Sequence, residues 1–427
     1  MEHPASNRQT APADVDQMLR GPVDEWLAAL ARGTRDIGRL LGAPAEEQER
    51  VGSRHTLREI GQQPVTWVET AGLLAGHVDA VEKALAFVSG DAAPGSIVLT
   101  GSGSSLYAGE CLAPALQAAL RLPVHAVPAG ELLIQPGSFL PSRGPSLLVS
   151  FGRSGNSPES CGAIDAVREA APGCRHLVIT CNPLGRLATR YGDDPRVTSV
   201  VLYEKTNDRS LVMTSSFTNM VLAARLLGMS RDVPRYLGYG ASVARAGAQV
   251  LLRHSDALAA VGRGAYGSAV YLGSGCRYGS AREAALKMLE MTDGRVKTFP
   301  ETFLGVRHGP MCAIDDDALV VCFLAADRVT RAYEADLVRE LVRKRLGARK
   351  VIVGCDVPAE LVSSQDVVVD VAGLDAVGDH GAPLVDVLVG QLLAVFRCLS
   401  FGLRPDMPSD DGVINRVVED FAIHRRS

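Results

Sequence analysis

Residues 99–103 read Leu-Thr-Gly-Ser-Gly, and residues 271–275 read Tyr-Leu-Gly-Ser-Gly, about 172 positions later. Two further apolar words recur at nearly the same interval: Leu-Leu-Val-Ser-Phe (147–151) with Leu-Val-Val-Cys-Phe (319–323), and Leu-Val-Ile-Thr-Cys (177–181) with Lys-Val-Ile-Val-Gly-Cys (350–355). Self-similarity at a fixed period indicates a duplicated structural unit. We therefore predict two copies of one domain, joined near residues 238–258.

Each apolar run ends in a Gly- or Ser-rich turn, and a helix-like stretch separates it from the next run, which predicts parallel β-α-β units. A composition with 47% hydrophobic but only 5% aromatic residues also favours an α/β protein with buried parallel strands. The predicted fold has two open, mainly parallel sheets flanked by helices. The predicted parts are 1–70 (a disordered start over 1–14, then helices), 71–240, 241–400 and a tail over 401–427, with single helices expected over 15–41 and 66–89.

Composition narrows the classes of partner. The net charge is −4 without a basic run, so we expect no nucleic-acid partner. No apolar signal region and no run of 18 apolar residues occur, so we expect a cytoplasmic protein with no membrane partner. The nine scattered Cys residues predict buried, reduced thiols. Neither zinc-ligand spacing nor a redox-cofactor fingerprint is present, so we expect no metal and no cofactor.

Two serine-rich turns follow the first two strands of the first copy, at residues 101–105 (Gly-Ser-Gly-Ser-Ser) and 152–157 (Gly-Arg-Ser-Gly-Asn-Ser). A small-residue turn that opens a helix binds phosphate through backbone N–H groups, the helix dipole and hydroxyls. The second copy continues instead as Cys-Arg-Tyr at 276–278. The sequence therefore predicts a phosphate site in the first copy only. A nucleoside triphosphate is not expected, because no Gly-Lys-Ser/Thr follows.

Two further segments carry polar groups. Residues 213–216 (Met-Thr-Ser-Ser) offer hydroxyls that could bind a sugar or cap a helix, and the residues alone leave both alternatives open. In the second copy, Glu283, Lys287 and Glu290 are spaced to share one face of a largely apolar helix. Such a stripe fits the wall of a cleft, although an exposed helix with ordinary ion pairs would show the same spacing.

Together these motifs resemble the sugar isomerase (SIS) domain family. The Ser-Gly-Asn-Ser turn at 154–157, the 213–216 segment, Arg-His-Gly-Pro at 307–310 and Asn-Arg-Val-Val at 415–418 resemble one branch in particular. That branch is the galactosamine-6-phosphate deaminase/isomerase, long labelled tagatose-6-phosphate ketose/aldose isomerase. It is similar to the isomerase half of glucosamine-6-phosphate synthase, and the resemblance covers roughly residues 55–424.

The resemblance assigns roles to residues at matching positions. It implies phosphate binding by Ser104, Ser105, Arg153, Ser154 and Ser157, sugar binding by Ser215 and Ser216, and catalysis by Glu283, Lys287, Glu290 and His308. It also implies a homodimer or higher even oligomer whose active sites lie between subunits.

The implied substrate is an amino-hexose 6-phosphate, with galactosamine 6-phosphate favoured, and the implied enzyme is a deaminase/isomerase and in part a hydrolase. A histidine suits ring opening because it exchanges a proton near neutral pH, so His308 takes that role. One carboxylate over two adjacent carbons serves proton transfer between C2 and C1, so Glu290 takes that role. Lys287 would place positive charge near the reacting oxygens, and hydrolysis of the imine would release ammonia.

Three departures from the synthase pattern bear on this expectation. The spacing from Glu290 to His308 is slightly longer, and the tail offers Arg416 and His424 where the synthase has a lysine. Residue 2 is Glu2 and not a nucleophilic cysteine, so we expect release of ammonia and not its capture from glutamine. Two alternative functions remain open: an aldose–ketose isomerase of a non-aminated sugar phosphate, and a non-catalytic sugar-phosphate sensor.

Overall fold

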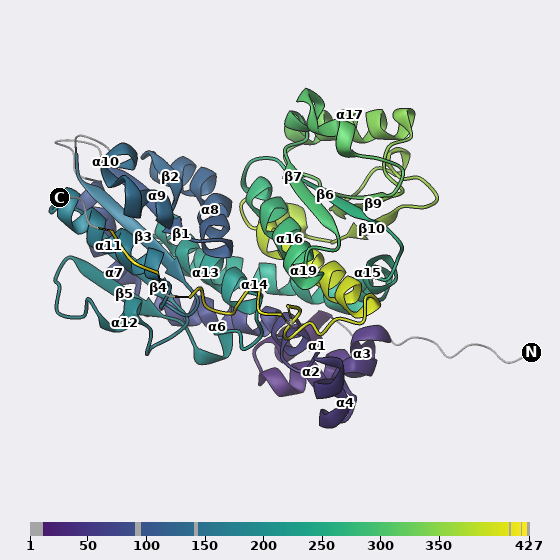
Figure 1. Cartoon of the computed structure of the whole chain (residues 1–427), viewed down its shortest axis with the longest axis horizontal. Coiled ribbons are helices and arrows are strands. Elements are labelled where there is room, and N and C mark those ends of the chain that lie inside the picture. The colour runs from purple at the N-terminus through teal and green to yellow at the C-terminus, as the bar shows by residue number, and fades with distance from the viewer. Residues whose placement is uncertain (1–11, 90–94, 141–143, 410, 420, 425–427) are drawn as a thin grey trace, which may run out of the picture.

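The computed structural model describes residues 12–89, 95–140, 144–409, 411–419 and 421–424. These residues form two five-stranded parallel sheets, one in each half of the molecule (Figure 1). The first sheet has the order β2 (Val124–Pro128), β1 (Ser96–Gly101), β3 (Ser146–Gly152), β4 (Arg175–Thr180) and β5 (Val197–Val201). The second has the order β10 (Val367–Asp370), β9 (Arg349–Gly354), β8 (Ala318–Phe323), β6 (Ser268–Leu272) and β7 (Lys297–Glu301).

The two sheets share one topology. Strands β6 to β10 occupy the places of β1 to β5, and the registers repeat: Leu99 lies opposite Val149, as Tyr271 lies opposite Val321. The turns after β1 and β6 also match, because Gly103 and Gly275 both adopt a positive φ, 54° and 56°, just before a helix. Glycine suits this backbone since it lacks a Cβ. The predicted duplication and α/β class are confirmed, and the exact domain boundaries stay a prediction.

Helices cover both faces of each sheet, as parallel strands require. The helices of the first half are α8 (Ser104–Leu120), α9 (Ala129–Ile134), α10 (Pro136–Phe139), α11 (Pro158–Ala170), α12 (Arg186–Thr189) and α13 (Ser215–Arg225). Those of the second half are α16 (Cys276–Met291), α17 (Arg328–Lys344), α18 (Leu374–Val377) and α19 (Ala382–Ser400). The equivalent helices α8 and α16 pack against each other, which brings the ends of β1 and β6 to one central region.

The N-terminal region is broken into shorter helices than the sequence predicts. They are α1 (Pro12–Leu19), α2 (Val23–Gly33), α3 (Asp36–Leu41), α4 (Ala45–Val51), α5 (Thr56–Gly61), α6 (Gln63–Ala75) and α7 (Val78–Val88). The single helix expected over 15–41 is wrong, because the chain turns at Gly21-Pro22 and again between α2 and α3. The helix expected over 66–89 is likewise interrupted, at Gly76. The disorder predicted for 1–14 falls largely on residues 1–11, outside the described residues.

The connection between the halves is also helical. The α14 helix (Val233–Gln249) passes through a π turn over Val250–His254 into α15 (Ser255–Gly262), so the predicted joint over 238–258 is helical. Among the described helices, α19 alone has the length and hydropathy of a membrane-spanning segment, but 94% of its apolar window is buried inside the protein. All nine Cys side chains are free, and all except the exposed Cys312 are buried as predicted.

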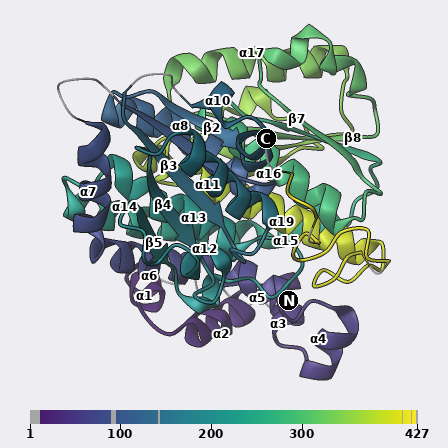
Figure 2. The ribbon, with the colours of Figure 1, turned by 60° about the vertical axis from the view of Figure 1, so that its left-hand side comes forward.

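Figure 2 shows that α1 to α4 lie together at one end of the molecule. The C-terminal segment after α19 leaves the second half and runs across to the first, where Ile423 approaches Gly162 of α11 (Figure 1). This tail therefore closes over the carboxyl ends of the first sheet, where ligands bind in open parallel sheets.

Candidate active site

A cavity of about 550 Å³, here called the cradle cavity, lies where β1 and β3 end. Its floor is formed by the turns 102–105 and 152–157, one wall by Glu290 of α16, and its cover by tail residues 412–419. All five residues predicted to bind phosphate line it: Ser104, Ser105, Arg153, Ser154 and Ser157. The structure thus brings the two serine-rich turns and the predicted base into one cavity.

The two turns present hydroxyls at helix N-termini, because Ser104 and Ser105 begin α8 and Ser157 precedes Pro158, the first residue of α11. The Ser157 and Ser160 hydroxyls lie 2.6 Å apart, and Ser154 Oγ accepts a hydrogen bond from the Asn156 backbone N–H. Two helix N-termini that converge on one space favour an anion there.

Arg153 lines the cradle cavity, but its guanidinium is bonded to backbone carbonyls of the protein. Its Nη1 donates to the carbonyls of Ser210 (3.2 Å) and Leu211 (2.9 Å), and its Nη2 donates to the carbonyl of Arg416 in the tail. Burial lowers the pKa of Arg153 below its ordinary value. Arg153 therefore links the tail and the 207–211 loop to the cradle. Because its N–H groups are used in these bonds, it would act on a phosphate through its positive charge and not through bidentate hydrogen bonds.

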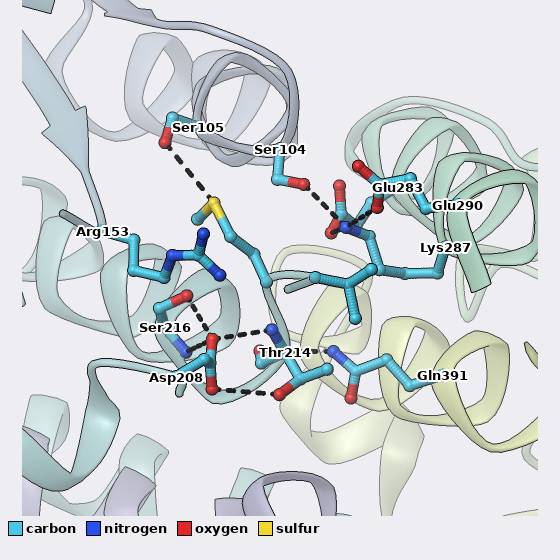
Figure 3. A network of polar contacts seen from close by, with 12 residues as sticks. Ser104, Ser105, Arg153, Asp208, Thr214, Ser216, Glu283, Lys287, Glu290 and Gln391 are labelled. Atoms are coloured by element: carbon cyan, nitrogen blue, oxygen red, sulfur yellow. Dashed lines mark hydrogen bonds and ion pairs between the residues drawn. The ribbon is translucent and has the colours of Figure 1, made fainter. Parts of the chain in front are cut away.

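The three charged residues of α16 form a buried chain, seen in Figure 3. Lys287 Nζ lies 3.3 Å from Glu283 Oε1 and 2.5 Å from Glu290 Oε2, and it donates to Ser104 Oγ at 3.0 Å. Glu283 and Lys287 are fully buried, whereas the Glu290 side chain is 24% exposed and faces the cavity. The exposed-helix alternative is therefore wrong for this stripe.

Burial and charge pull in opposite directions within this chain. Burial raises the pKa of Glu283 to about 8, although Lys287 opposes the effect. Burial lowers the pKa of Lys287, but the neighbouring carboxylates outweigh burial and hold it above its ordinary value. Lys287 is therefore a cation held between Glu290 and Ser104 of the serine-rich turn at 101–105.

Ser215 and Ser216 do not line the cradle cavity. Both are fully buried at the start of α13, where the Asp208 carboxylate accepts from the backbone N–H groups of Thr214, Ser215 and Ser216 and from the Ser216 hydroxyl (Figure 3). The Ser215 hydroxyl accepts from Gln62 and Asn219. The structure thus places these serines in a helix cap, the second of the two alternatives that the residues left open.

Asp208 is the residue that sequence reasoning missed. It is 1% exposed, its carboxylate caps α13, and its carbonyl accepts from the Arg416 guanidinium. The run Asn-Asp-Arg-Ser at 207–210 was the available signal, because Asp is a preferred cap residue. Its role was hidden because it stands six residues before Thr214, which occupies the cap position of α13 itself.

His308 lies apart from the other predicted catalytic residues. It ends a short 3₁₀ turn, η4 (Gly305–His308), is exposed, and is not among the residues that line the cradle cavity. Its neighbour Arg307 is held by Glu340 of α17 at 2.8 Å. Of the two tail residues considered, Arg416 lines the cavity, whereas His424 is exposed outside it. In a single chain, therefore, Glu290 lines the cradle cavity and His308 does not.

Metal-ligating side chains do not gather in the described part of the chain: no three His, Cys, Asp or Glu residues are close enough to hold an ion. The cradle offers hydroxyls, the buried Arg153 and two accessible carboxylates, Glu290 of α16 and Glu419 of the tail, which is chemistry for an anionic substrate and a proton transfer.

Comparison with known proteins identifies the relatives of the chain. No protein-family model matches it. A Streptomyces coelicolor protein that carries the AgaS name is 38% identical over 375 residues, which is 87% of this chain and 95% of that protein. The Escherichia coli D-galactosamine-6-phosphate deaminase AgaS is 33% identical over 379 residues, 86% of this chain and 95% of its own.

A solved structure gives the same answer. The tagatose-6-phosphate ketose/aldose isomerase of Escherichia coli superposes with a TM-score of 0.78 at 30% identity, over 87% of this chain and 97% of that one. These relatives carry deaminase and isomerase names. The hydrolase class that the sequence analysis expected is therefore wrong. Because the match extends over nearly the whole of each relative, the chain belongs to the AgaS family of D-galactosamine-6-phosphate deaminases.

Proposed function

We propose that this chain converts galactosamine 6-phosphate to tagatose 6-phosphate and ammonia. The observation that carries the proposal is that Glu290 and both serine-rich turns line one cavity, with Lys287 bonded to both sides. The named activity of the Escherichia coli relative supports the choice of substrate. A cavity of about 550 Å³ has the size of a small-ligand site.

The 6-phosphate would lie between the starts of α8 and α11. There it would receive hydrogen bonds from the hydroxyls of Ser104, Ser105, Ser154 and Ser157, in the field of two helix N-termini. Holding the phosphate at this end orients the rest of the sugar toward Glu290 and fixes the distance from C6 to the reacting carbons, which is the positioning contribution to catalysis.

The chemical step moves one proton from C2 to C1 and a second from the C2 ammonium group to O1. Glu290, as carboxylate, takes the C2 proton of the open-chain aldose while O1 takes a proton from the ammonium group, which gives an enolamine with a hydroxyl on C1. The same carboxyl returns the proton to C1, which leaves C1 as an alcohol and C2 as an iminium. Water then adds to C2, and ammonia leaves, so the reaction consumes one water and releases one ammonia.

Lys287 and Glu283 act behind Glu290. The Lys287 ammonium orients the Glu290 carboxylate through a 2.5 Å contact and stabilises negative charge that develops on the substrate oxygens. The fully buried Glu283 holds Lys287 from the other side at 3.3 Å. Lys287 is thus a positioning residue, because it does not itself line the cavity.

Ring opening requires a group that this cavity lacks in a single chain. We propose that His308 supplies it from a second copy, in a homodimer or higher even oligomer. The exposure of His308 on the turn Gly305–His308, beside the half-exposed Leu304, supports a surface available for such a contact. The free cysteines of the chain suit a reducing compartment, so the proposal places the enzyme in the cytoplasm.

A paired kinetic assay tests this function. Purified protein is given galactosamine 6-phosphate, glucosamine 6-phosphate or galactose 6-phosphate, and ammonia and ketose phosphate are measured separately. We expect ammonia and ketose in equal amounts from galactosamine 6-phosphate. The isomerase name of the structural relative favours one alternative, which is isomerisation of a sugar phosphate without release of ammonia. If galactose 6-phosphate gives ketose and galactosamine 6-phosphate gives no ammonia, this alternative replaces our proposal. Binding without turnover of any sugar would indicate the sensor.

A further inference from the structure

A second cavity borders the 207–211 loop, because Asn207 and Arg209 line it, whereas Leu211 lines the cradle. It has a volume of about 1070 Å³, and we call it the N-terminal cavity. It is bounded by the start of α2, by α4 and α5, by the 3₁₀ turn η1 (Glu204–Thr206) and by Arg416 of the tail. In Figures 1 and 2 this is the region where the N-terminal helices meet the first half of the molecule. The proposed reaction makes no use of it.

The charged lining of this cavity is mainly positive. Its cations are Arg54, Arg58, Lys205, Arg209 and Arg416, its acids are Asp24, Glu59 and Glu204, and His55 adds a titratable donor. Arg58 is paired with Asp24 at 2.6 Å, Arg54 with Glu49, and Lys205 with Glu69 at 2.8 Å. Among the described residues, the guanidinium of Arg209 has no hydrogen-bond or ion-pair partner, although it is exposed in a cavity already rich in cations.

The buried Glu59 does not neutralise Arg209. Its Oε1 accepts from the Arg209 backbone N–H at 2.5 Å, and its Oε2 accepts from the Ser210 hydroxyl. Both carboxylate oxygens of Glu59 therefore bond to the 207–211 loop, and neither pairs with the guanidinium of Arg209. Because three of the five lining cations are paired with carboxylates, Arg209 and Arg416 are the two that remain to attract an anion into this concave site, and guanidinium groups match phosphate oxygens in particular.

The same loop also borders the cradle, which Leu211 lines. Arg153, in the cradle, donates to the carbonyls of Ser210 and Leu211, the two residues that follow Arg209. Arg416 lines both cavities: its carbonyl accepts from Arg153, and its guanidinium bonds Asn207 Oδ1 at 3.0 Å and the Asp208 carbonyl. A ligand bound to Arg209 and Arg416 would therefore affect the backbone segments whose carbonyls hold Arg153 in the cradle.

We propose that the N-terminal cavity is a second, regulatory binding site for a small phosphorylated compound, coupled to the cradle through the 207–211 loop and Arg416. The ligand class is a phosphomonoester or free phosphate, because the site presents forked cations and a space larger than the cradle. Arg209 is its principal contact. The proposal does not depend on which sugar the cradle converts.

Calorimetric titration tests the binding, with the protein carrying Glu290→Gln so that no turnover occurs. Inorganic phosphate and tagatose 6-phosphate are titrated separately, which distinguishes free phosphate from a sugar phosphate. We expect two binding events. Arg209→Ala should weaken one event about tenfold or more, the value of one lost charge-assisted hydrogen bond, and leave the other unchanged. Ser154→Ala should do the converse. Arg343→Ala, which removes an exposed arginine of α17, is the charge-matched control and should leave both unchanged.

The coupling is tested by turnover in the chain with Glu290 intact. Inorganic phosphate added at saturating galactosamine 6-phosphate should change kcat at least twofold, and Arg209→Ala should abolish that change. A single binding event that Ser154→Ala removes would overturn the site, as would equal effects of Arg209→Ala and Arg343→Ala. Two events with an unaltered kcat would overturn the coupling. Because calorimetry needs no turnover, failure of the proposed reaction would leave this test readable.

Discussion

Lys287 of α16 and Ser104 of α8 are joined by a 3.0 Å hydrogen bond between residues 183 positions apart in the chain. The two helices occupy equivalent places in the duplicated halves, yet α8 follows the serine-rich turn at 101–105 and α16 carries Glu290, the proposed base. The bond therefore connects the half with the serine-rich turns to the half with the proposed base. In the proposed reaction, each copy of the duplicated domain contributes a different part of one site.

We predict that Lys287→Met destabilises the protein by about 3–5 kcal/mol above pH 8, where the buried Glu283 is ionised, because it leaves that carboxylate without its cation. Adding Glu283→Gln should restore part of the loss. Urea unfolding at pH 9 measures both effects. The matched control is Lys344→Met, whose side chain is 48% exposed and which should cost less than about 1 kcal/mol. Equal losses in the two lysine variants would contradict a buried charge chain.

Replacing Glu290 by Gln removes the proton acceptor with little change in shape. We expect kcat for ammonia release to fall by about 10²–10⁴, the usual contribution of a general base, while KM changes little because the phosphate contacts remain. Steady-state kinetics with galactosamine 6-phosphate measure both values. Glu46→Gln, on the exposed face of α4, should behave as the unchanged protein. A Glu290→Gln enzyme with full kcat would rule out Glu290 as the base.

Ser216 and Ser154 allow the cap and the cradle to be separated. Ser216→Ala should cost about 1–2 kcal/mol of stability through the lost bond to Asp208, with KM within about twofold of the unchanged protein. Ser154→Ala should leave stability nearly unaltered and raise KM severalfold. Thermal unfolding and kinetics on the same preparations measure the pair. A large rise in KM for Ser216→Ala at normal stability would restore Ser216 as a sugar contact.

The sequence alone predicted the features that depend on neighbouring residues, namely the buried strands and the turns that follow them. Buried central strands read as apolar runs, and the serine turns after β1 and β3 were visible because they follow those runs directly. Strands β2, β7 and β10 were missed: each is a partly exposed edge strand, and β2 and β7 contain proline, which weakens the strand pattern.

The rest of the site depends on contacts that helix or strand periodicity does not predict. Whether the Ser216 hydroxyl meets a sugar or a cap depends on how the loop eight residues earlier places Asp208. Sequence placed Lys287 beside Glu290 through helical periodicity, but its bond to Ser104 requires α8 and α16 to pack together. His308 was found through resemblance alone, and a single chain leaves it outside the cavity.

The carboxyl of Glu59 predicts a pH dependence of stability. Burial, reinforced by the charge of Asp208, raises its pKa from 4.5 to about 7 in the folded protein. Because the folded state binds this proton more tightly than the unfolded chain, its contribution is most favourable below pH 4.5 and is lost as pH rises toward 7. Glu59→Gln, which cannot ionise, should therefore gain stability relative to the unchanged protein between pH 5 and pH 8, by at most about 3 kcal/mol. Urea unfolding at both pH values measures the difference, with the exposed Glu169→Gln as control. A gain of the same size in both variants, or a gain toward acid pH, would show that Glu59 is not the titrating group.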